Sequence, residues 1–269
     1  MDKGENGVIL FPNYQKLKEN IERMKIELSM LLLERDELKF VVCKNIETAY
    51  CLKFGAIEHK AYEAQCVALR LKRKIDLIQR KINRQEKIVI KIIEQMLDEE
   101  FAEYQKKLNE QIEKMNEAIE RSNCKKLTDS ENKELKKLYR IIVKNLHPDV
   151  NPNVSEVQIR LLENAISAYK GGDIVTLRTI ELMVGEQKLP EQSQDAMNML
   201  FKENERLESM LATVKEQISE IKNSYPYTVR DIVEDSQKEK ERREEVENIL
   251  GQYQKLIEIY KAKLSEMLR

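Results

Sequence analysis

Apolar residues recur at alternating spacings of four and three along much of this chain, which is the heptad pattern of coiled-coil helices. The first run starts after Tyr14, and its members are Leu17, Ile21, Met24, Leu28, Leu31, Arg35, Leu38 and Val42. Arg35 interrupts the apolar stripe, and a polar residue in such a position fixes the register of a coiled coil. Only seven glycines and five prolines punctuate the 269 residues. A β-sandwich, barrel or Rossmann domain needs turn residues roughly every 8 to 15 positions, so long helices are predicted instead.

The heptad phase is lost at two places, and each loss predicts that a long helix folds back on itself. The first break is at Lys53–Glu58, around Gly55, and the second is at Asn223–Thr228, around Pro226. After the first break the pattern resumes with Leu71, Ile75, Ile78, Ile82, Gln85, Val89, Ile92 and Met96, and a further run comprises Phe101, Leu108, Ile112, Met115 and Ile119. The second break separates Leu200, Asn204, Leu207, Leu211, Val214, Ile218 and Ile221 from Val246, Ile249, Tyr253, Leu256, Tyr260 and Leu264.

The sequence therefore predicts an all-α chain in which long antiparallel coiled-coil hairpins flank a module of short helices. The expected divisions are a tail over residues 1–12, a hairpin with a third helix over 13–122, the short-helix module over 123–189 and a second helical hairpin over 190–269. The same heptads would also serve pairing between two chains, so a homo-oligomer stays open as an alternative.

The charge balance and hydropathy argue against two classes of partner. Lysine and arginine number 47 against 48 aspartate and glutamate, so the chain lacks the basic excess of a nucleic-acid-binding protein. A basic stretch at Arg70, Lys72, Arg73 and Lys74 is interpreted as a solvated coiled-coil face. The longest apolar runs have four residues, such as Met30–Leu33, against the roughly 18 of a membrane span. Neither nucleic acid nor a membrane is expected as a partner.

The amino-terminal residues and the cysteines favour a reduced compartment. Met1–Gly7 include acids and no apolar segment, so no secretory signal is expected and the predicted location is the cytoplasm. Cys43, Cys51, Cys66 and Cys124 form no Cys-x-x-Cys pair, and three of them fall inside helical patterns. No metal site, no disulfide and no cofactor are predicted.

Residues 123–189 carry the start and stop signals of short helices. Thr128 with Glu131, and Ser155 with Gln158, have the spacing of capping boxes, so each pair is expected to begin a helix. The expected end signals are Pro148 for the first helix and Gly171-Gly172 for the second, and Asp173 is expected to cap a third helix.

The first of these helices is predicted to have an apolar side and a basic side. Its apolar positions are Leu135, Leu138, Ile142 and Leu146, and the opposite side carries Lys133, Lys137, Arg140 and Lys144. Glu134 is the only acid between Lys133 and Leu146, whereas an ordinary solvated face mixes both signs. One interpretation of the basic side is a docking surface for an acidic partner, and the other is a solubilising face.

A short loop follows this helix. Pro148 and Pro152 enclose Asp149, and they are expected to hold the loop rigid with His147 and Asp149 projecting from it. The His-Pro-Asp tripeptide, the basic helix before it and the returning helix after it resemble the J domain of DnaJ-type co-chaperones. The resemblance covers residues 127–182, about a fifth of the chain.

This resemblance implies a helical module that docks on a DnaK-type chaperone and stimulates its ATP hydrolysis. It assigns the stimulation to His147, Pro148 and Asp149. It assigns docking to the basic helix face, with Tyr139, Arg140, Lys137, Lys144 and Lys133, and it makes Ala168 and Tyr169 packing residues of the returning helix. The coiled coils would then bind a client or fix the geometry of the assembly.

The chain departs from the family pattern in several respects. The Tyr-x-x-Leu-Gly signature of the family's first helix is absent, and the charged helix over about Glu99–Arg121 is the candidate to pack in its place. Ile141 stands where the family often has a second basic residue, and the returning helix stops at Gly171-Gly172. Neither a Gly/Phe-rich linker nor a zinc module follows.

Two functions stay open at this point. One is a J-domain co-chaperone adaptor, and the other is a coiled-coil scaffold whose J-like module is only a rigid elbow. An enzyme is not expected. His147 lies close to Asp149, and the only other histidine is His59, but proton transfer also needs a pocket and a third group that orients the base.

Overall fold

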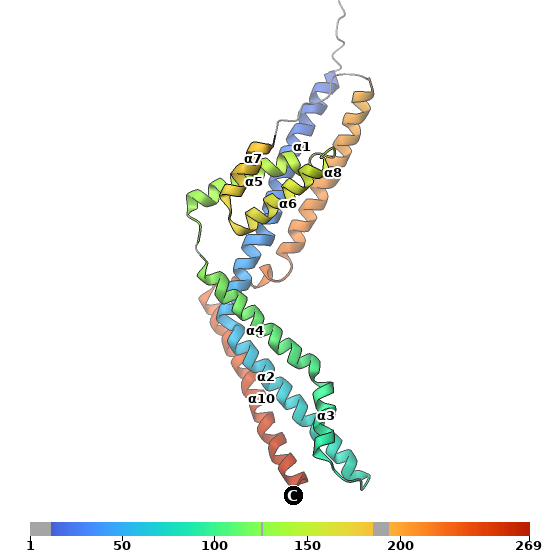
Figure 1. Ribbon diagram of the computed structural model, residues 1–269, viewed down its shortest axis with the longest axis vertical. Helices are drawn as coiled ribbons and strands as arrows, with labels where there is room; N and C mark the ends of the chain where they lie inside the picture. Colours follow the sequence, from blue (N-terminus) through green and yellow to red (C-terminus); the bar gives the residue numbers. More distant parts are fainter. Residues whose placement is uncertain (1–11, 125, 185–193) are drawn as a thin grey trace, which may run out of the picture. The chain divides into compact units, whose positions relative to one another are not determined.

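The computed structural model describes residues 12–124, 126–184 and 194–269, and these contain helices and no strand (Figure 1). The predicted all-α class is confirmed for this part of the chain. The helices are α1 (Pro12–Glu37), the π-helical turn η1 (Leu38–Val42), α2 (Cys43–Asn83), α3 (Ile90–Glu100), α4 (Ala102–Asn123), α5 (Asp129–Leu146), α6 (Glu156–Gly171), α7 (Ile174–Met183), α8 (Gln194–Lys222), the 3-10 turn η2 (Tyr227–Val229), α9 (Arg230–Glu234) and α10 (Ser236–Met267). None of the helices in these three ranges has both the length and the apolar character needed to cross a bilayer.

Two compact units make up the chain, and each combines segments that are far apart in the sequence. The first unit contains α1, η1 and α5–α8, and the second contains α2 beyond Cys43 together with α3, α4, α9 and α10. The short-helix module is therefore not a separate body, because it shares its unit and its hydrophobic core with α1 and α8.

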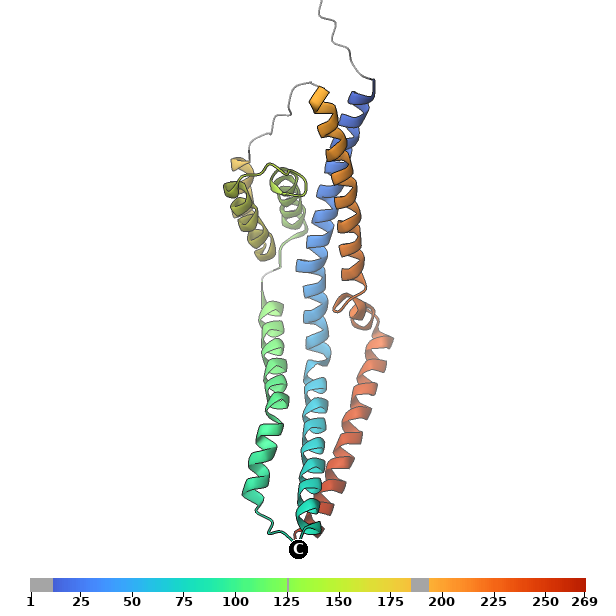
Figure 2. The ribbon, with the colours of Figure 1, turned by 90° about the vertical axis from the view of Figure 1, so that its right-hand side faces the viewer.

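In the first unit, α1 packs along α8, and the two helices run in the same direction (Figures 1 and 2). Contacts that fix their register join Asn20 to Asn204 at 2.7 Å, Glu27 to Lys215 at 2.8 Å, and Glu34 to Lys222 at 2.8 Å. The residue number rises along both helices together, which only a parallel pair allows. Leu28, Leu32 and Leu207 are fully buried in the seam. The first heptad run therefore lies on a long helix with one buried side, as predicted, but its partner is α8 and not the run that begins at Leu71.

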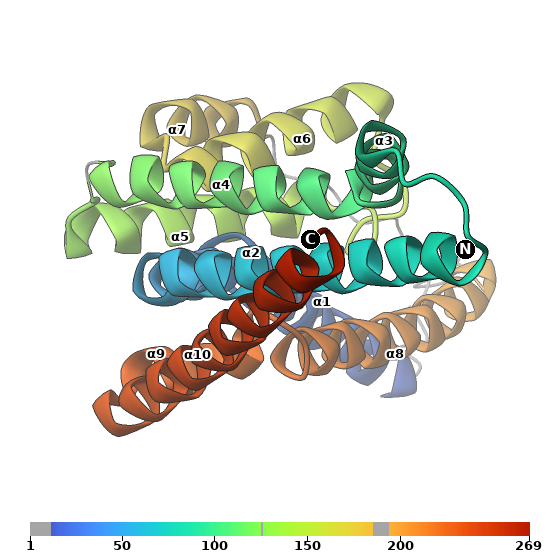
Figure 3. The same cartoon turned by 90° about the horizontal axis from the view of Figure 1, so that it is seen from below.

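In the second unit, α10 runs parallel to α2, which separates it from α4 (Figures 2 and 3). The contacts are Lys53 with Glu239 at 2.6 Å, Glu58 with Arg242 at 2.8 Å, and Leu264 buried with Ile75 and Ile78. The helix break predicted at Asn223–Thr228 is confirmed, since α8 ends at Lys222. The predicted antiparallel hairpin around it is wrong, because α8 packs on α1 and α10 packs on α2. A heptad specifies neither the partner nor its direction, which explains the error.

The chain does fold back after α2, but at residues 84–89 and not at Lys53–Glu58, where α2 is continuous. Gln85 has a φ of 55°, its N–H donates to the carbonyl of Ile82, and the N–H of Glu86 donates to the carbonyl of Lys81. This is the Schellman pattern of a helix end. Glycine usually marks that left-handed position, so a glutamine there left no recognisable signal in the sequence. The predicted heptad run through Gln85 and Val89 is interrupted here for the same reason.

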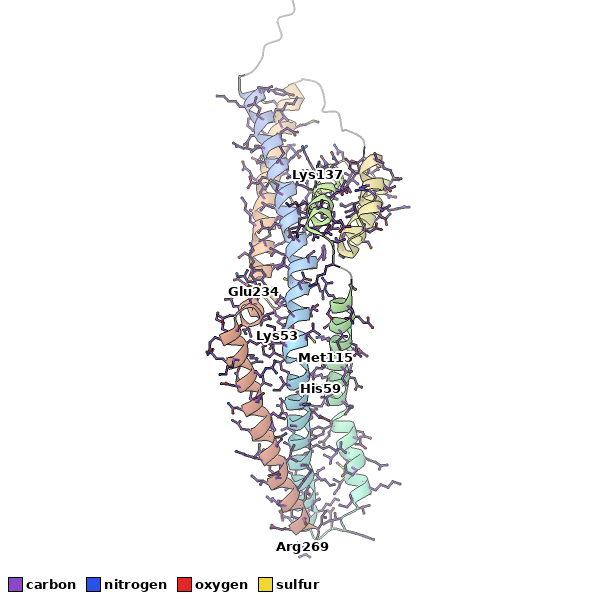
Figure 4. The ribbon with its side chains drawn as sticks, turned by 90° about the vertical axis from the view of Figure 1, so that its left-hand side faces the viewer. Lys53, His59, Met115, Lys137, Glu234 and Arg269 are labelled. Carbon is purple, nitrogen blue, oxygen red and sulfur yellow. The ribbon has the colours of Figure 1, made fainter. Side chains whose placement is uncertain are left out.

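The returning arm of this hairpin is formed by α3 and α4. Its antiparallel direction is shown by contacts of Arg70 with Asp98, His59 with Gln111, and Asn45 with Arg121. Gly55, predicted to be a turn, lies inside α2. A Cβ at this position would meet Cγ of Met115 on α4 at 3.0 Å and Sγ of Cys51 at 3.1 Å (Met115 is labelled in Figure 4). The glycine therefore permits close contact between two helices.

The short helices α5, α6 and α7 begin at the predicted capping residues. Both capping boxes form, with Thr128 at the start of α5 and Ser155 at the start of α6. Asp173 caps α7 by accepting a hydrogen bond from the N–H of Thr176. Gly172 ends α6 with a φ of 71°, as expected for a left-handed helix stop.

Gly172→Ala should destabilise the protein, whereas Gly171→Ala should not. A Cβ on Gly172 would be in the left-handed region and 3.2 Å from Cδ1 of Leu127, so we expect a loss of about 1–2 kcal/mol. A Cβ on Gly171 meets no atom within 4 Å, and alanine there should add up to about 0.5–1 kcal/mol. Chemical denaturation of the two variants measures the difference, and equal effects would contradict the left-handed stop.

Candidate partner-binding site at the α5–α6 loop

The helix α5 has the predicted division into an apolar and a basic side. Leu135, Leu138, Ile142 and Leu146 are buried, while Lys133, Lys137 and Arg140 are exposed and Lys144 is half-buried (Lys137 is labelled in Figure 4). No ion pair joins these four cations to a carboxylate of the described residues. Glu134, the only acid between Lys133 and Leu146, is instead paired with Arg178 of α7, whose Nε lies 2.6 Å from Oε1. Arg140 shares a surface hollow with three glutamates of α1, each paired with another lysine: Glu27, Glu34 and Glu37. The basic side therefore keeps its positive charge.

The loop after α5 is held by hydrogen bonds in addition to its prolines. His147 caps α5, and its Nδ1 accepts the N–H of Asp149 at 3.1 Å. The side-chain amide of Asn151 donates to the carbonyls of Lys144 and Asn145 at 2.6 and 3.0 Å. Asn151 thus bonds two carbonyls of the last turn of α5, a role not predicted from the sequence although asparagine is a common turn residue.

His147 does not project freely from the loop, contrary to the prediction. Its side chain is 15% exposed, that of Asp149 is 37% exposed, and Pro148 lies on the surface. Burial lowers the pKa of His147, and the carboxylate of Asp149 opposes that shift. The imidazole is therefore mostly neutral near pH 7, with its Nδ1 already occupied as an acceptor.

Tyr139 does not belong to the exposed docking face, which corrects a second prediction. It is fully buried, its ring stacks on Tyr169 with centroids 4.2 Å apart, and its hydroxyl donates to Oδ2 of Asp36 at 2.6 Å. Burial raises the pKa of Tyr139, and the charge of Asp36 raises it further. The packing role predicted for Tyr169 agrees with this arrangement, since Tyr169 is 2% exposed.

The carboxylate of Asp36 is the centre of a buried polar network. Oδ1 accepts Nε and Nη2 of Arg35 at 2.9 and 2.8 Å, and Nη1 of Arg35 reaches Oε1 of Gln217 on α8 at 3.4 Å. Arg35 was recognised in the sequence as a polar interruption of the heptad. Asp36 was not, because nothing in a single sequence marks one acid of a charged helix as buried.

The long helix that packs against α5 is α1. The prediction that the charged helix at Glu99–Arg121 would take this place is wrong. That helix is mostly α4, which belongs to the second unit. Besides the Tyr139–Asp36 bond, Lys136 forms an ion pair with Glu37, and Nζ of Lys170 lies 4.2 Å from the ring centre of Phe40. The module is thus attached to the end of α1 and to η1.

The loop also contacts α8. Nη1 of Arg206 donates to the backbone carbonyl of Asp149 at 2.7 Å. The other guanidinium nitrogens of Arg206 bind the carboxylate of Glu203 at 2.8 and 2.9 Å. Nothing in the sequence distinguishes Arg206 from the other charged residues of α8, because a heptad marks only the apolar positions around it.

The chain matches no model of a protein family, no curated protein and no solved structure. Among the described residues no group of three or more His, Cys, Asp or Glu side chains is arranged to hold a metal ion. The second histidine, His59, is on α2 and contacts Oε1 of Gln111 through Nδ1 at 3.2 Å. What the site offers is a rigid loop beside an unpaired basic surface.

Tyr139→Phe should reduce stability, because it leaves Oδ2 of the buried Asp36 without its donor. We expect a loss of about 1–3 kcal/mol in the free energy of unfolding. The matched control is Tyr169→Phe, since the hydroxyl of Tyr169 makes no hydrogen bond to the described residues and its ring keeps the stack. Both variants are compared by denaturant titration, and equal losses would show that the Asp36 contact contributes nothing specific.

Proposed function

We propose that this protein is a J-domain-like co-chaperone or adaptor that docks on a DnaK-type chaperone and stimulates its ATPase. The observation that carries the proposal is the juxtaposition, on one capped helix, of an unpaired basic side and a His-Pro-Asp loop. Arg140, Lys137 and Lys133 are exposed on α5 about two, three and four turns before that loop. In this proposal the chain itself catalyses nothing, because the hydrolysis takes place in the chaperone.

The basic side would supply the docking energy. Four cations without a described acidic partner create a local positive potential, although the whole chain has a formal net charge of only −1. Such a surface attracts an acidic partner and accelerates encounter, and the attraction is screened over about 8 Å at physiological ionic strength. Ionic strength should therefore affect the encounter more than the fold, whose core is apolar.

The loop would supply the activating contact. Its backbone is fixed by the bonds from Asn151 and by the N–H of Asp149 on His147, so the exposed part of Asp149 is presented in one geometry. A preorganised loop loses little conformational entropy when a partner binds. The helix α1 supplies the packing that the family's first helix would give, and the remaining helices are available to a client. A cytoplasmic location is part of this proposal.

A coiled-coil scaffold is the second candidate, and one observation favours it. Tyr139 and most of His147 are used inside the protein, where they join α5 to α1 and stiffen the loop. Since these contacts stabilise the fold, they explain the presence of both residues without an external partner. In that function the module would be a fixed elbow that sets the geometry of the coiled coils.

The loop variants separate the two functions. In a single-turnover assay with a cognate DnaK-type chaperone, we expect the wild type to stimulate ATP hydrolysis and Asp149→Asn and His147→Gln to lose that stimulation. The control is His59→Gln, the same replacement on α2, which should behave as the wild type. Equal stimulation by the wild type and by Asp149→Asn would contradict the co-chaperone function and leave the scaffold.

Arg140→Ala should weaken docking without removing the activating contact. Each exposed cation contributes about 0.2–1 kcal/mol, so the affinity for the chaperone should fall by a factor of about 1.4 to 5, and its dependence on salt should become shallower. Arg160→Ala removes the same charge from the exposed surface of α6 and serves as the control. Titrations at two salt concentrations measure both effects. Identical salt dependence in the two variants would exclude the basic side of α5 as the docking surface.

A further inference from the structure

Arg206 is held in a defined orientation between α8 and the His-Pro-Asp loop. The neighbouring Leu207 is fully buried in the α1–α8 seam, which anchors this part of α8. The carboxylate of Glu203 accepts hydrogen bonds from Nε and Nη2 of Arg206, and Nη1 of Arg206 donates to the carbonyl of Asp149 at 2.7 Å. The side chain of Arg206 is 27% exposed, so the contact is partly shielded from water. A bidentate arginine clamp of this kind is among the stronger hydrogen-bonding arrangements in proteins.

The charge of Arg206 also acts on the Asp149 side chain. The hydrogen bond to Glu203 raises the pKa of Arg206, and the nearby carboxylate of Asp149 raises it further. A basic group of a partner that approached Asp149 would therefore meet a carboxylate whose field is already partly neutralised. It would have to displace or compensate Arg206 to gain a full ion pair.

The loop also packs into the core that α1 shares with the module. Val150 and Tyr139 are both fully buried, and Tyr139 is bonded to Asp36. Arg35 and Asp36 lie close enough to His147 to influence its pKa, in opposite directions. The loop is thus bonded to α8 through Arg206, and Val150 anchors it in the core that includes apolar residues of α1 and α8.

We propose that the α1–α8 pair is an inhibitory restraint on the His-Pro-Asp loop: Asn151 and His147 set the shape of the loop, and Arg206 is the contact that holds the loop against α8. This inference rests on the proposed co-chaperone function, and it adds the regulation of the same site. Release of α8 from the loop frees the Asp149 carbonyl and carboxylate together. The basic side of α5 stays exposed in either state, so docking precedes activation.

The test uses the full chain with Arg206→Gln, and Lys202→Gln as the matched control one turn earlier on the exposed surface of α8. Hydrogen exchange is measured at the amides of Asp149, Val150 and Asn151, and ATPase stimulation is measured in parallel. We expect loop exchange roughly tenfold faster in Arg206→Gln, with α1 amides unchanged, because a charge-assisted bond has been removed. We also expect half-maximal stimulation at a severalfold lower protein concentration. Arg206→Lys keeps the charge without the fork and should give an intermediate acceleration, should Arg206→Gln fold poorly.

The two readouts distinguish the possible failures. Loop exchange equal to that of Lys202→Gln in both Arg206 variants would overturn the restraint, whatever the ATPase shows. Faster loop exchange without stimulation by any variant would support the restraint and contradict the co-chaperone function. Faster exchange with weaker stimulation would overturn the inhibitory role, because Arg206 would then position the loop for activity.

Discussion

The carboxylate of Asp36 is the contact on which the arrangement of the first unit depends. A buried charge is expensive unless every acceptor position finds a donor, and here Arg35 supplies two donors and Tyr139 a third. Arg35 also reaches Gln217, and Tyr139 stacks on Tyr169, so one network touches α8, α1, α5 and α6. Apolar burial supplies most of the stability of these helices, but it would tolerate sliding. The network does not, since a shift of α1 by one turn would take Asp36 away from the hydroxyl of Tyr139 and Arg35 away from Gln217.

The parallel pairing of α1 with α8 and of α2 with α10 illustrates a general limit of heptad patterns. The pattern predicts correctly that Leu28, Leu207 and Leu264 are buried, because the 3.5-residue period alone determines which side of a helix is apolar. The partner and its direction are decided by pairs that no periodicity reveals, such as Asn20 with Asn204 and Glu58 with Arg242. Connections as long as the one between α1 and α8 make a parallel pair feasible, whereas short turns would have enforced antiparallel hairpins.

Local signals predicted the module well, and long-range contacts explain what they missed. The capping boxes at Thr128 and Ser155 and the stop at Gly172 depend on residues within one helical turn, so the sequence contains all the information they need. The burial of His147 and Tyr139 depends on α1, which is about a hundred residues away in the chain. Gly55 and Gln85 also show that local signals alone can mislead about where a chain turns. A glycine that looks like a turn permits the approach of Met115, while the actual turn has a glutamine in the left-handed position.

In the proposed function, docking on α5 and engagement of the loop depend on different interactions. Its basic side is exposed and unpaired, so a partner that binds there disturbs neither Asp36 nor the stacked tyrosines. Its far end is different, because the loop is bonded to Arg206 and buries Val150 in the core, and a partner that moves the loop must break these contacts. The first step is favoured by long-range attraction and weakened by salt. The second step draws on short-range bonds that salt hardly affects, so the two steps respond to different conditions although they involve one helix.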